Sequence, residues 1–288
     1  MLAHAHQRHT GEGVAAVVSL RSVPFIAAPT VRSLRLRLYA RDLTLATATG
    51  FVAACGGQSF LLTNHHVATG LNPITGEFLG KHAVHPEYVE VVHNAAGLIG
   101  KHVLISEPLY DQAGRGLWRE HPVHGKRVDV VALPLTRTAG ATLYPHDPWK
   151  QDPPVALNVT SDVSVVGFPF GRSSSELALW TRGTVASEIN LDHDGLPLYL
   201  IDARTRTGQS GSPVVFFARY GMVPLEDGAN IVNGGALDLF LGVYSGRISE
   251  DSDLGMVWKP NAVIDLLTSG PRTEVRNGNG VDAQDNAP

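Results

Sequence analysis

The sequence predicts an all-β protein with one helix near its C-terminal end. Short runs of apolar and β-branched residues recur along the chain, and Gly, Pro, Asn and Asp separate them, as is typical of strands joined by turns. The clearest runs are residues 34–39, 60–63, 89–92, 163–166 and 198–201. The first of them alternates strictly, as expected of a strand with one buried face. Helical periodicity is convincing mainly over residues 261–267, between Pro260 and Gly270.

The strand-like runs fall into two groups, separated by a segment with few strand formers. Residues 136–154 combine one glycine with four prolines, a composition that favours a connector between two β-rich halves. We therefore expect an N-terminal extension, two β-rich halves and a tail, at residues 1–30, 31–140, 141–269 and 270–288. The tail is rich in Asn, Asp and Gly, so we expect it to be disordered. Within the extension, residues 14–20 fit either a short helix or a strand.

The composition indicates a soluble globular protein. With 288 residues, of which 43% are hydrophobic, the chain can bury a sizeable core. A formal net charge of −4 without basic clusters argues against nucleic-acid binding. No run of about 18 apolar residues predicts a membrane span, and residues 1–9 lack the apolar core of a signal peptide. The single cysteine, Cys55, cannot form an intramolecular disulfide, so we expect a cytoplasmic location; a missing leader is the alternative.

Three segments carry the residue types that acyl transfer from a peptide bond requires. Residues 207–213 form a glycine-rich turn that contains Ser210, a nucleophile. Residues 61–67 form an apolar strand that ends at a pair of histidines. Residues 128–133 form an apolar run with Asp129 near its start, where burial could aim the carboxylate at a histidine. Taken alone, the turn could be an ordinary polar loop, and the aspartate could be satisfied by backbone N–H groups.

The order His, Asp, Ser, together with further segments, resembles the trypsin-like serine endopeptidases of the chymotrypsin fold, in particular bacterial-type members without disulfides. The further segments are residues 166–169, 183–185 and 242–246, and the resemblance covers roughly residues 47–267. It implies two six-stranded antiparallel β-barrels followed by a C-terminal helix. The active site would then lie in the groove between the barrels. The resemblance also implies a hydrolase that uses neither a cofactor nor a metal ion.

The resemblance assigns a role to each polar residue of these segments. Ser210 is the nucleophile, and His66 accepts its proton and later donates it to the leaving amine. Asp129 holds the other ring nitrogen of His66 and stabilises the imidazolium. The backbone N–H groups of Gly208 and Ser210 form the oxyanion hole. The sequence therefore predicts a complete catalytic triad with its oxyanion hole.

Two of these assignments depend on register. His65 and His66 are adjacent, and the Thr-x-x-His pattern of the family selects His66, which leaves His65 partly exposed or supporting the site. Asp111 and Asp147 compete with Asp129, but the first lies in a turn composition and the second lies among prolines. Only Asp129 heads an apolar strand, so we expect it to be the partner of the histidine.

One position in the turn departs from the trypsin pattern. Trypsins carry an aspartate directly before the nucleophile, where it pairs with a newly formed amino terminus, whereas this chain has Gln209. We therefore expect no trypsin-style zymogen activation. The enzyme is then either constitutively folded or controlled by a protein partner, an effector or residues 1–30.

The resemblance also implies where substrate specificity is set. Arg204, six residues before the nucleophile, falls at the base of the primary specificity pocket. An arginine there would repel Lys or Arg and pair with Asp or Glu, so our hypothesis is an acidic or polar preference. Alternatively, Arg204 and Arg206 are solvated charges.

Four consecutive residues are expected to contact substrate beside that base. Ser245, Gly246 and Arg247 lie along the pocket wall and the edge that pairs with the substrate backbone. Tyr244 stands where glutamyl endopeptidases of this fold carry a histidine, so the parallel with those enzymes is incomplete.

We expect the substrate to be a specific protein or peptide that binds in the groove as an added strand. Two alternatives stay open: a protease-like fold with a silent site that only binds, and an esterase that uses the same residues. His4, His6 and His9 raise the option of a metal site, but they lack strand or helix pattern and a nearby cysteine or acid pair. We interpret them as part of a polar terminus.

Overall fold

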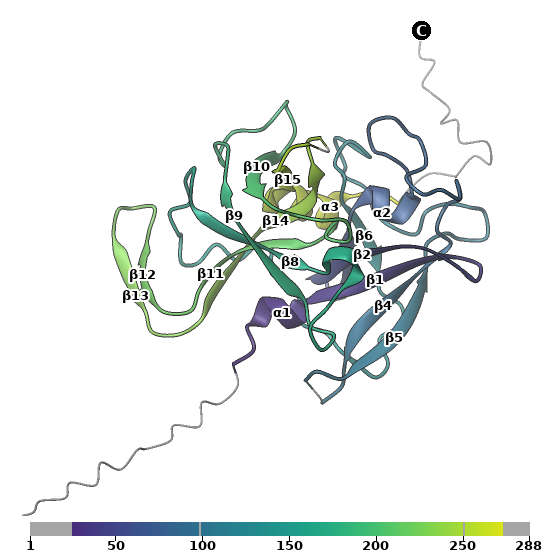
Figure 1. Cartoon of the computed structure of the whole chain (residues 1–288), viewed down its shortest axis with the longest axis horizontal. Helices are drawn as coiled ribbons and strands as arrows, with labels where there is room; N and C mark the ends of the chain where they lie inside the picture. The colour runs from purple at the N-terminus through teal and green to yellow at the C-terminus, as the bar shows by residue number, and fades with distance from the viewer. Residues whose placement is uncertain (1–24, 98, 250, 273–288) are drawn as a thin grey trace, which may run out of the picture.

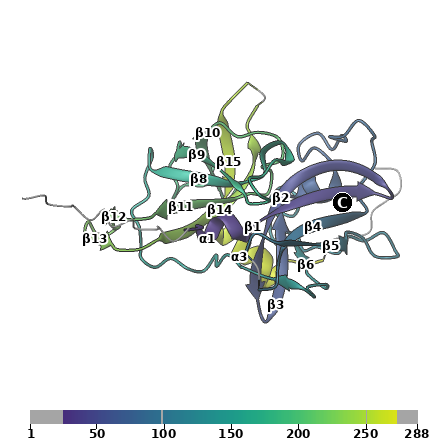
Figure 2. The same ribbon diagram turned by 60° about the horizontal axis from the view of Figure 1, so that its bottom comes forward.

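The computed structural model describes residues 25–97, 99–249 and 251–272. These residues form two β-rich halves that lie side by side, the N-terminal half in purple to blue and the C-terminal half in green (Figures 1 and 2). Residues 273–288 of the predicted tail, the apolar run at residues 14–20 and the N-terminal histidine cluster lie outside the described residues. Within the described part, no helix is long and apolar enough to cross a membrane.

The N-terminal half is a seven-stranded antiparallel sheet. Its strands are β1 (Ser33–Ala40), β2 (Leu43–Cys55), β3 (Gln58–Thr63), β4 (Tyr88–Ala95), β5 (His102–Pro108), β6 (Val131–Pro134) and β7 (Ala141–Thr142). The strand order is β5-β4-β1-β2-β3-β6, and β7 pairs with the end of β4. The runs predicted at residues 34–39, 60–63 and 89–92 fall inside β1, β3 and β4, so these predictions are confirmed.

The structure does not confirm that the N-terminal half closes into a barrel. β5 and β6 are the ends of the sheet, and no ladder joins them in the described chain. β6 has only four residues, all paired with β3, and the segment before it makes one bridge to β6, between Arg119 and Ala132. Instead, the buried Glu107 carboxylate in β5 accepts the backbone N–H groups of Thr136 and Arg137, both at 2.8 Å. Side-chain bonds thus span a gap that a short strand leaves open.

The C-terminal half contains a closed six-stranded barrel, as the sequence predicted. Its strands are β8 (Asp162–Gly167), β9 (Leu179–Val185), β10 (Leu198–Ala203), β11 (Pro213–Ala218), β14 (Leu237–Arg247) and β15 (Leu254–Trp258). They close in the order β10-β15-β14-β11-β8-β9. The runs predicted at residues 163–166 and 198–201 lie in β8 and β10.

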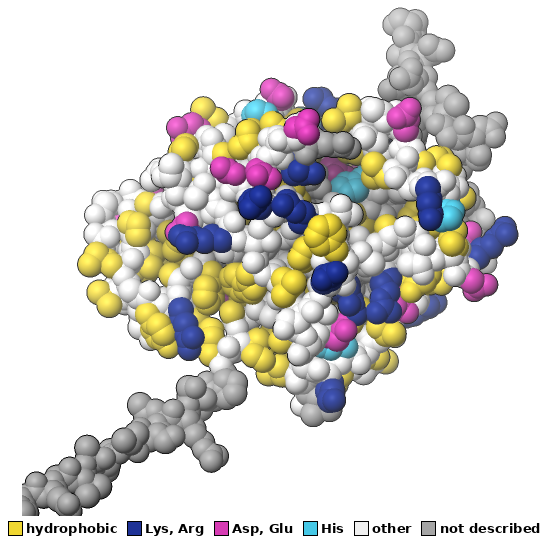
Figure 3. Space-filling model, in the orientation of Figure 1, with side chains coloured by type: hydrophobic (Ala, Val, Ile, Leu, Met, Phe, Trp, Pro, Cys, Tyr) yellow, Lys and Arg dark blue, Asp and Glu magenta, His cyan; other side chains and the backbone are white. Residues whose placement is uncertain are grey.

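A two-stranded hairpin of β12 (Gly221–Pro224) and β13 (Asn230–Asn233) projects from the C-terminal barrel (Figure 1). Met222 and Val232 face each other across it and are largely exposed. The sequence did not predict this hairpin. Apolar side chains are visible on this part of the surface (Figure 3).

Short helices complete the fold: α1 (Ala28–Arg32), α2 (His65–Thr69), the 3-10 turn η1 (Pro169–Gly171) and α3 (Pro260–Ser269). The helix predicted over residues 261–267 is therefore confirmed as α3. Its buried residues follow helical spacing and are Ala262, Val263, Leu266 and Leu267.

One buried core joins the two halves through α3. Phe51 and Phe60 come from the N-terminal sheet, Phe240 and Trp258 from the C-terminal barrel, and Leu266 from α3. Because α3 packs on both β6 and β14, burial of its apolar face fixes the halves relative to each other. The two halves are therefore held together by a core that they share.

A histidine is buried in the N-terminal sheet without a hydrogen-bond partner. His93 in β4 has 0% of its surface exposed, and neither ring nitrogen is hydrogen-bonded within the described chain. Burial lowers the pKa of His93 to about 4, although the negative charge of Glu107 partly opposes this shift. At a pH between about 4 and 6.5, His93 is therefore neutral in the folded protein and protonated in the unfolded chain.

We predict that His93 makes the fold less stable at mildly acidic pH. Between its unfolded pKa of about 6.5 and its folded pKa of about 4, the unfolded chain binds more protons, so stability falls as pH falls. The loss across this window should be about 3 kcal/mol. Urea unfolding at a series of pH values should show a flatter profile for His93→Leu than for wild type. The exposed-histidine control His82→Leu should keep the wild-type slope, and equal slopes for all three proteins would contradict the prediction.

Candidate active site

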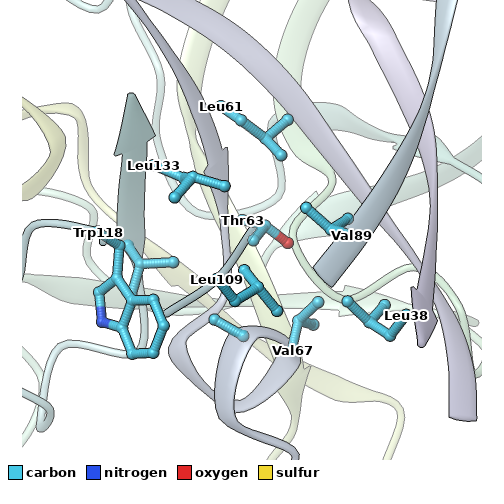
Figure 4. A pocket seen from close by; sticks show the side chains of 10 residues that line it. Leu38, Leu61, Thr63, Val67, Val89, Leu109, Trp118 and Leu133 are labelled. Carbon is cyan, nitrogen blue, oxygen red and sulfur yellow. The ribbon is translucent and has the colours of Figure 1, made fainter. Parts of the chain in front are cut away.

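The predicted base, His66, sits on a one-turn helix that is anchored on the sheet core. β3 ends at Thr63 and α2 begins at His65. Val67 and Ala68 on α2 are buried and line a cavity of about 10 Å³ (Figure 4). Gly70 ends the helix in the left-handed conformation and donates its N–H to the His66 carbonyl at 2.8 Å. The packed face of α2 therefore fixes the backbone from which the imidazole projects.

The imidazole of His66 is held by a buried carboxylate. Asp129 Oδ2 lies 2.7 Å from His66 Nδ1, and Asp129 Oδ1 accepts the His66 backbone N–H at 2.9 Å. The Ser245 hydroxyl donates to the same Oδ2, and the Asn64 amide donates to the Asp129 backbone carbonyl at 2.7 Å. An ionised carboxylate can only accept a hydrogen bond, so Nδ1 of His66 must be the donor and must carry the ring proton. Nε2 is then unprotonated and can accept a proton.

The surroundings keep Asp129 charged despite its burial. Only 2% of the residue is exposed, and burial by itself would raise its pKa. Two effects outweigh burial: the electrostatic attraction between the carboxylate and the His66 ring, and the hydrogen bonds from His66 and Ser245. The pKa of Asp129 therefore lies below its ordinary value. At neutral pH the site therefore contains a fixed negative charge behind the imidazole.

The predicted nucleophile, Ser210, lies in a turn that needs two glycines. Gly208 has φ +95°, and a Cβ there would come within 2.5 Å of the Phe168 carbonyl oxygen. Gly211 has φ +82°, and a Cβ there would lie 2.4 Å from Thr63 Oγ1. The turn is therefore pressed against the end of β3, three residues before His66.

Thr49 on β2 ties this turn to the N-terminal sheet. Its N–H donates to the Ser210 carbonyl at 2.9 Å, and its hydroxyl donates to the Gly208 carbonyl at 2.8 Å. The same hydroxyl accepts the Phe168 N–H at 3.1 Å, and the Thr49 carbonyl accepts the Thr63 hydroxyl at 2.9 Å. Thr49 has 0% of its surface exposed. One buried residue, through its backbone and its hydroxyl, thus connects the nucleophile turn with the strand that leads to the histidine.

The Ser210 side chain itself is half-buried and open to approach. No hydrogen bond joins its hydroxyl to His66 Nε2 in the described chain. In ligand-free sites this bond is often long and tightens when substrate binds. The backbone N–H groups of Gly208 and Ser210 also donate to no described group, so both are available to an oxyanion.

Gln209 anchors the other side of the turn. It has 0% of its surface exposed, its Oε1 accepts the Arg206 N–H at 2.8 Å, and its Nε2 donates to Thr181 Oγ1 at 2.9 Å. Both bonds are made by a neutral amide, in the position where trypsins carry an aspartate. No charge partner is therefore needed to hold this turn in place.

The predicted specificity residues divide into exposed and buried groups. Arg204 and Arg247 are exposed, and Gly246 is half-buried. Ser245 is buried with its hydroxyl on Asp129, so its side chain serves the His–Asp pair. Tyr244 is also buried, and its hydroxyl lies 2.5 Å from Thr205 Oγ1, a residue that the sequence did not single out.

The competing residues of the sequence lie elsewhere. His65 Nε2 is 3.3 Å from Glu120 Oε1. Asp111 closes its own turn through Arg115, and Asp147 accepts the Trp149 N–H at 3.0 Å. Across residues 25–97, 99–249 and 251–272, no three His, Cys, Asp or Glu side chains gather into a possible metal site.

Comparison with known families identifies the class of protein to which this fold belongs. The trypsin-like peptidase domain matches residues 48–221, which is more than half of the chain. The chain therefore belongs to the trypsin-like peptidase family, whose members are serine endopeptidases and thus hydrolases. The resemblance seen in the sequence is confirmed. A comparison with curated proteins finds no match.

Solved structures similar to this chain include two bacterial proteases and Deg5. The Rv3671c protease from M. tuberculosis in its active form is 18% identical, with 87% of this chain and 85% of that chain covered and a TM-score of 0.48. The serine endoprotease from Yersinia pestis is 11% identical, with 84% and 65% covered and a TM-score of 0.47. Deg5 is 16% identical, with 82% and 86% covered and a TM-score of 0.46.

We predict that Thr49→Val damages both stability and activity. Valine keeps the shape but leaves the Phe168 N–H and the Gly208 carbonyl unpaired in a buried place, which should lower the free energy of unfolding by about 2 kcal/mol. Loosening the turn should lower kcat by about tenfold or more with a smaller change in KM. Thr49→Ser should retain most of the stability and most of the activity. The exposed control Thr44→Val on the same strand should resemble wild type in both measurements. Normal kcat in Thr49→Val would remove Thr49 from this role.

A second prediction concerns Gln209. Gln209→Met retains volume but removes both anchoring bonds, so the rate of labelling by a fluorophosphonate should fall by about tenfold or more. Gln112→Met, at an exposed position, serves as the control. Unchanged labelling of Gln209→Met would show that the turn holds its shape without these bonds.

Proposed function

We propose that this chain is an active serine endopeptidase that cleaves a specific protein substrate with Ser210, His66 and Asp129. The observation that carries the proposal is the buried Asp129 carboxylate bonded to His66 Nδ1, with the glycine turn of Ser210 packed beside the end of β3. A proton on Nδ1 leaves Nε2 unprotonated, and an unprotonated Nε2 is the group that would accept the proton of Ser210.

Acylation begins when substrate binding brings the Ser210 hydroxyl to His66 Nε2. Ser210 Oγ attacks the carbonyl carbon of the scissile bond while its proton passes to Nε2. The carbonyl oxygen becomes an oxyanion that accepts the N–H groups of Gly208 and Ser210. Asp129 stabilises the imidazolium without taking the proton.

The C–N bond then breaks, and His66 gives its proton to the leaving amine. A water molecule next attacks the ester that Ser210 holds, again losing its proton to His66. The second tetrahedral intermediate collapses, the C–Oγ bond breaks, and the proton on His66 returns to Ser210. The products are a new carboxyl end and a new amino end, and the site is restored.

The substrate can bind as an extra strand along β14. Ladder pairing with β11 ends at Val243, and the Tyr244 backbone still bonds to Gly211 and Ser212. Beyond Tyr244, β14 pairs only with β15 in the described chain. The edge next to the nucleophile turn is therefore free between Ser245 and Arg247. Gly246 adds no side chain there, and an added Cβ would meet no atom within 4 Å. An extended peptide can use such an edge for backbone hydrogen bonds.

We further propose that the enzyme works inside the cell on one or a few proteins. The single cysteine fits a reducing compartment. Control then rests on a regulatory partner or on residues 1–30, because Gln209 cannot accept a newly formed amino terminus as a charged partner. A silent binding module and an esterase are the alternative functions.

We predict that wild type reacts with a fluorophosphonate probe at Ser210 and that Ser210→Ala does not. Both proteins are then incubated with a cell extract, and new protein ends are identified by mass spectrometry. Ends that appear with wild type alone identify the substrate and its cleavage site. Serine 212 provides a matched control, because Ser212→Ala changes a neighbouring, buried hydroxyl and should remain labelled.

The alternative functions give different results in this experiment. No labelling of wild type would support a silent binding module. Labelling and ester hydrolysis without any new protein ends, in extracts and with unfolded proteins, would support an esterase.

A further inference from the structure

The chemistry of the proposed function determines which side of the site receives the acyl part of the substrate. His66 must reach the leaving amine, and it belongs to the N-terminal half. The side chain of the residue that donates the acyl group, P1, therefore points toward the C-terminal barrel. There the Gly211 N–H donates to the Tyr244 carbonyl, and the Tyr244 N–H donates to the Ser212 carbonyl, both at 2.9 Å. The backbone of Tyr244 thus lies directly behind the nucleophile turn.

Three neighbouring backbone segments border the space beside this turn. The first leads from β10 into the turn, and its Ala203 N–H donates to the Asp253 carbonyl at 3.1 Å. The second is the end of β14, and the third is the start of β15, where Arg247 pairs with Gly255. A P1 side chain that enters the barrel side of the site must pass between these segments.

The side chain of Tyr244 crosses this space from one wall to another. A Cβ on Gly255 would lie 2.6 Å from Tyr244 Cε2, so the ring rests directly on the backbone of β15. At the far end of the ring, the hydroxyl lies 2.5 Å from Thr205 Oγ1 on the segment that leads into the turn. The ring therefore reaches from β14 over β15 to the opposite wall.

The burial of this pair indicates that little room is left. Tyr244 is 3% exposed and Thr205 is 1% exposed. Side chains that line a deep open pocket would be reached by solvent, and these are not. Burial also raises the pKa of Tyr244, so the pair is neutral and offers no charge to an ionic side chain.

We propose that Tyr244 and Thr205 close the primary pocket, so that the enzyme accepts a small, uncharged P1 side chain such as that of alanine. Arg204 and Arg247 are exposed at the rim and do not form the floor of the pocket. The specificity is therefore steric: a larger side chain would have to displace a tyrosine ring that is packed on one wall and hydrogen-bonded to another. This inference rests on the proposed function and adds its substrate class.

The test uses peptidyl diphenyl phosphonates that differ only in the P1 side chain: Ala, Leu, Phe, Glu and Arg. Each inactivates a serine protease when the serine oxygen displaces phenoxide from phosphorus, so no natural substrate is required. For wild type, the second-order rate constant for the Ala compound should exceed those for Phe, Glu and Arg by at least about tenfold. Faster reaction with the Glu compound would instead support an arginine-based acidic pocket and overturn the proposal, as would faster reaction with the Phe or Arg compound.

Variants of Tyr244 test the cause of the preference. Tyr244→Ala should open the space and raise the Phe-to-Ala ratio of rate constants by at least about tenfold. Tyr244→Phe keeps the ring over Gly255 and should retain the preference for Ala. An unchanged ratio in folded Tyr244→Ala would overturn the role of the ring, and the wild-type profile decides the matter if that variant does not fold.

Labelling by a small fluorophosphonate without a P1 side chain separates this inference from the proposed function. No labelling of wild type would mean that the proposed function fails. Labelling together with a preference for a bulky or charged P1 would mean that only the closed pocket is wrong.

Discussion

The arrangement of the site depends on the buried charge of Asp129. A carboxylate that is almost fully removed from water is stable only where donors surround it. Here the donors come from α2 through His66 and from β14 through Ser245, 63 and 116 residues away in sequence. The carboxylate is therefore fully hydrogen-bonded only when the N-terminal half and the end of β14 meet at this point. The same carboxylate also determines which nitrogen of the imidazole carries the proton.

Hydrogen bonds between uncharged groups hold the nucleophile turn. Thr49 bonds to both Ser210 and Gly208 from the opposite half of the chain, while Gln209 secures the turn within its own barrel. The two glycines allow the turn to approach Thr63 and Phe168 more closely than any side chain would permit. The apolar core that both halves share with α3 keeps the halves, and so the partners of these contacts, together. The nucleophile turn is thus held from several directions, and none of these contacts requires a free amino terminus.

Local sequence patterns predicted several strands, the C-terminal helix and the candidate catalytic residues. They did not predict residues such as Thr49, whose role depends on contacts with distant parts of the chain. The strands at residues 34–39 and 198–201 and the helix at residues 261–267 were readable because each has a clear period or length. His66, Asp129 and Ser210 stood out because each belongs to a short segment of recognisable composition. Thr49 carries no such signal, since its partner Gly208 is 159 residues away and any strand can contain a threonine.

The same reasoning explains two further differences between sequence and structure. Pattern suggests that strands exist but not whether a ladder closes, and at the gap between β5 and β6 the bonds come from the Glu107 side chain. Arg204 was assigned to the pocket base from the register of the resemblance, and its residue is exposed, while the neighbouring Thr205 is buried against the Tyr244 hydroxyl. Register does not specify side-chain direction, so it could not predict the contact between Tyr244 and Thr205.

The tautomer of His66 tests the central claim most directly. Nitrogen-15 NMR of histidine-labelled protein, with His66 assigned by its loss in His66→Gln, distinguishes a proton on Nδ1 from a proton on Nε2. The account predicts that neutral His66 carries its proton on Nδ1, and that Asp129→Asn disturbs this state because an amide can donate to that nitrogen. A neutral His66 protonated on Nε2 in the wild-type protein would contradict it, since Nε2 could then accept no proton from Ser210.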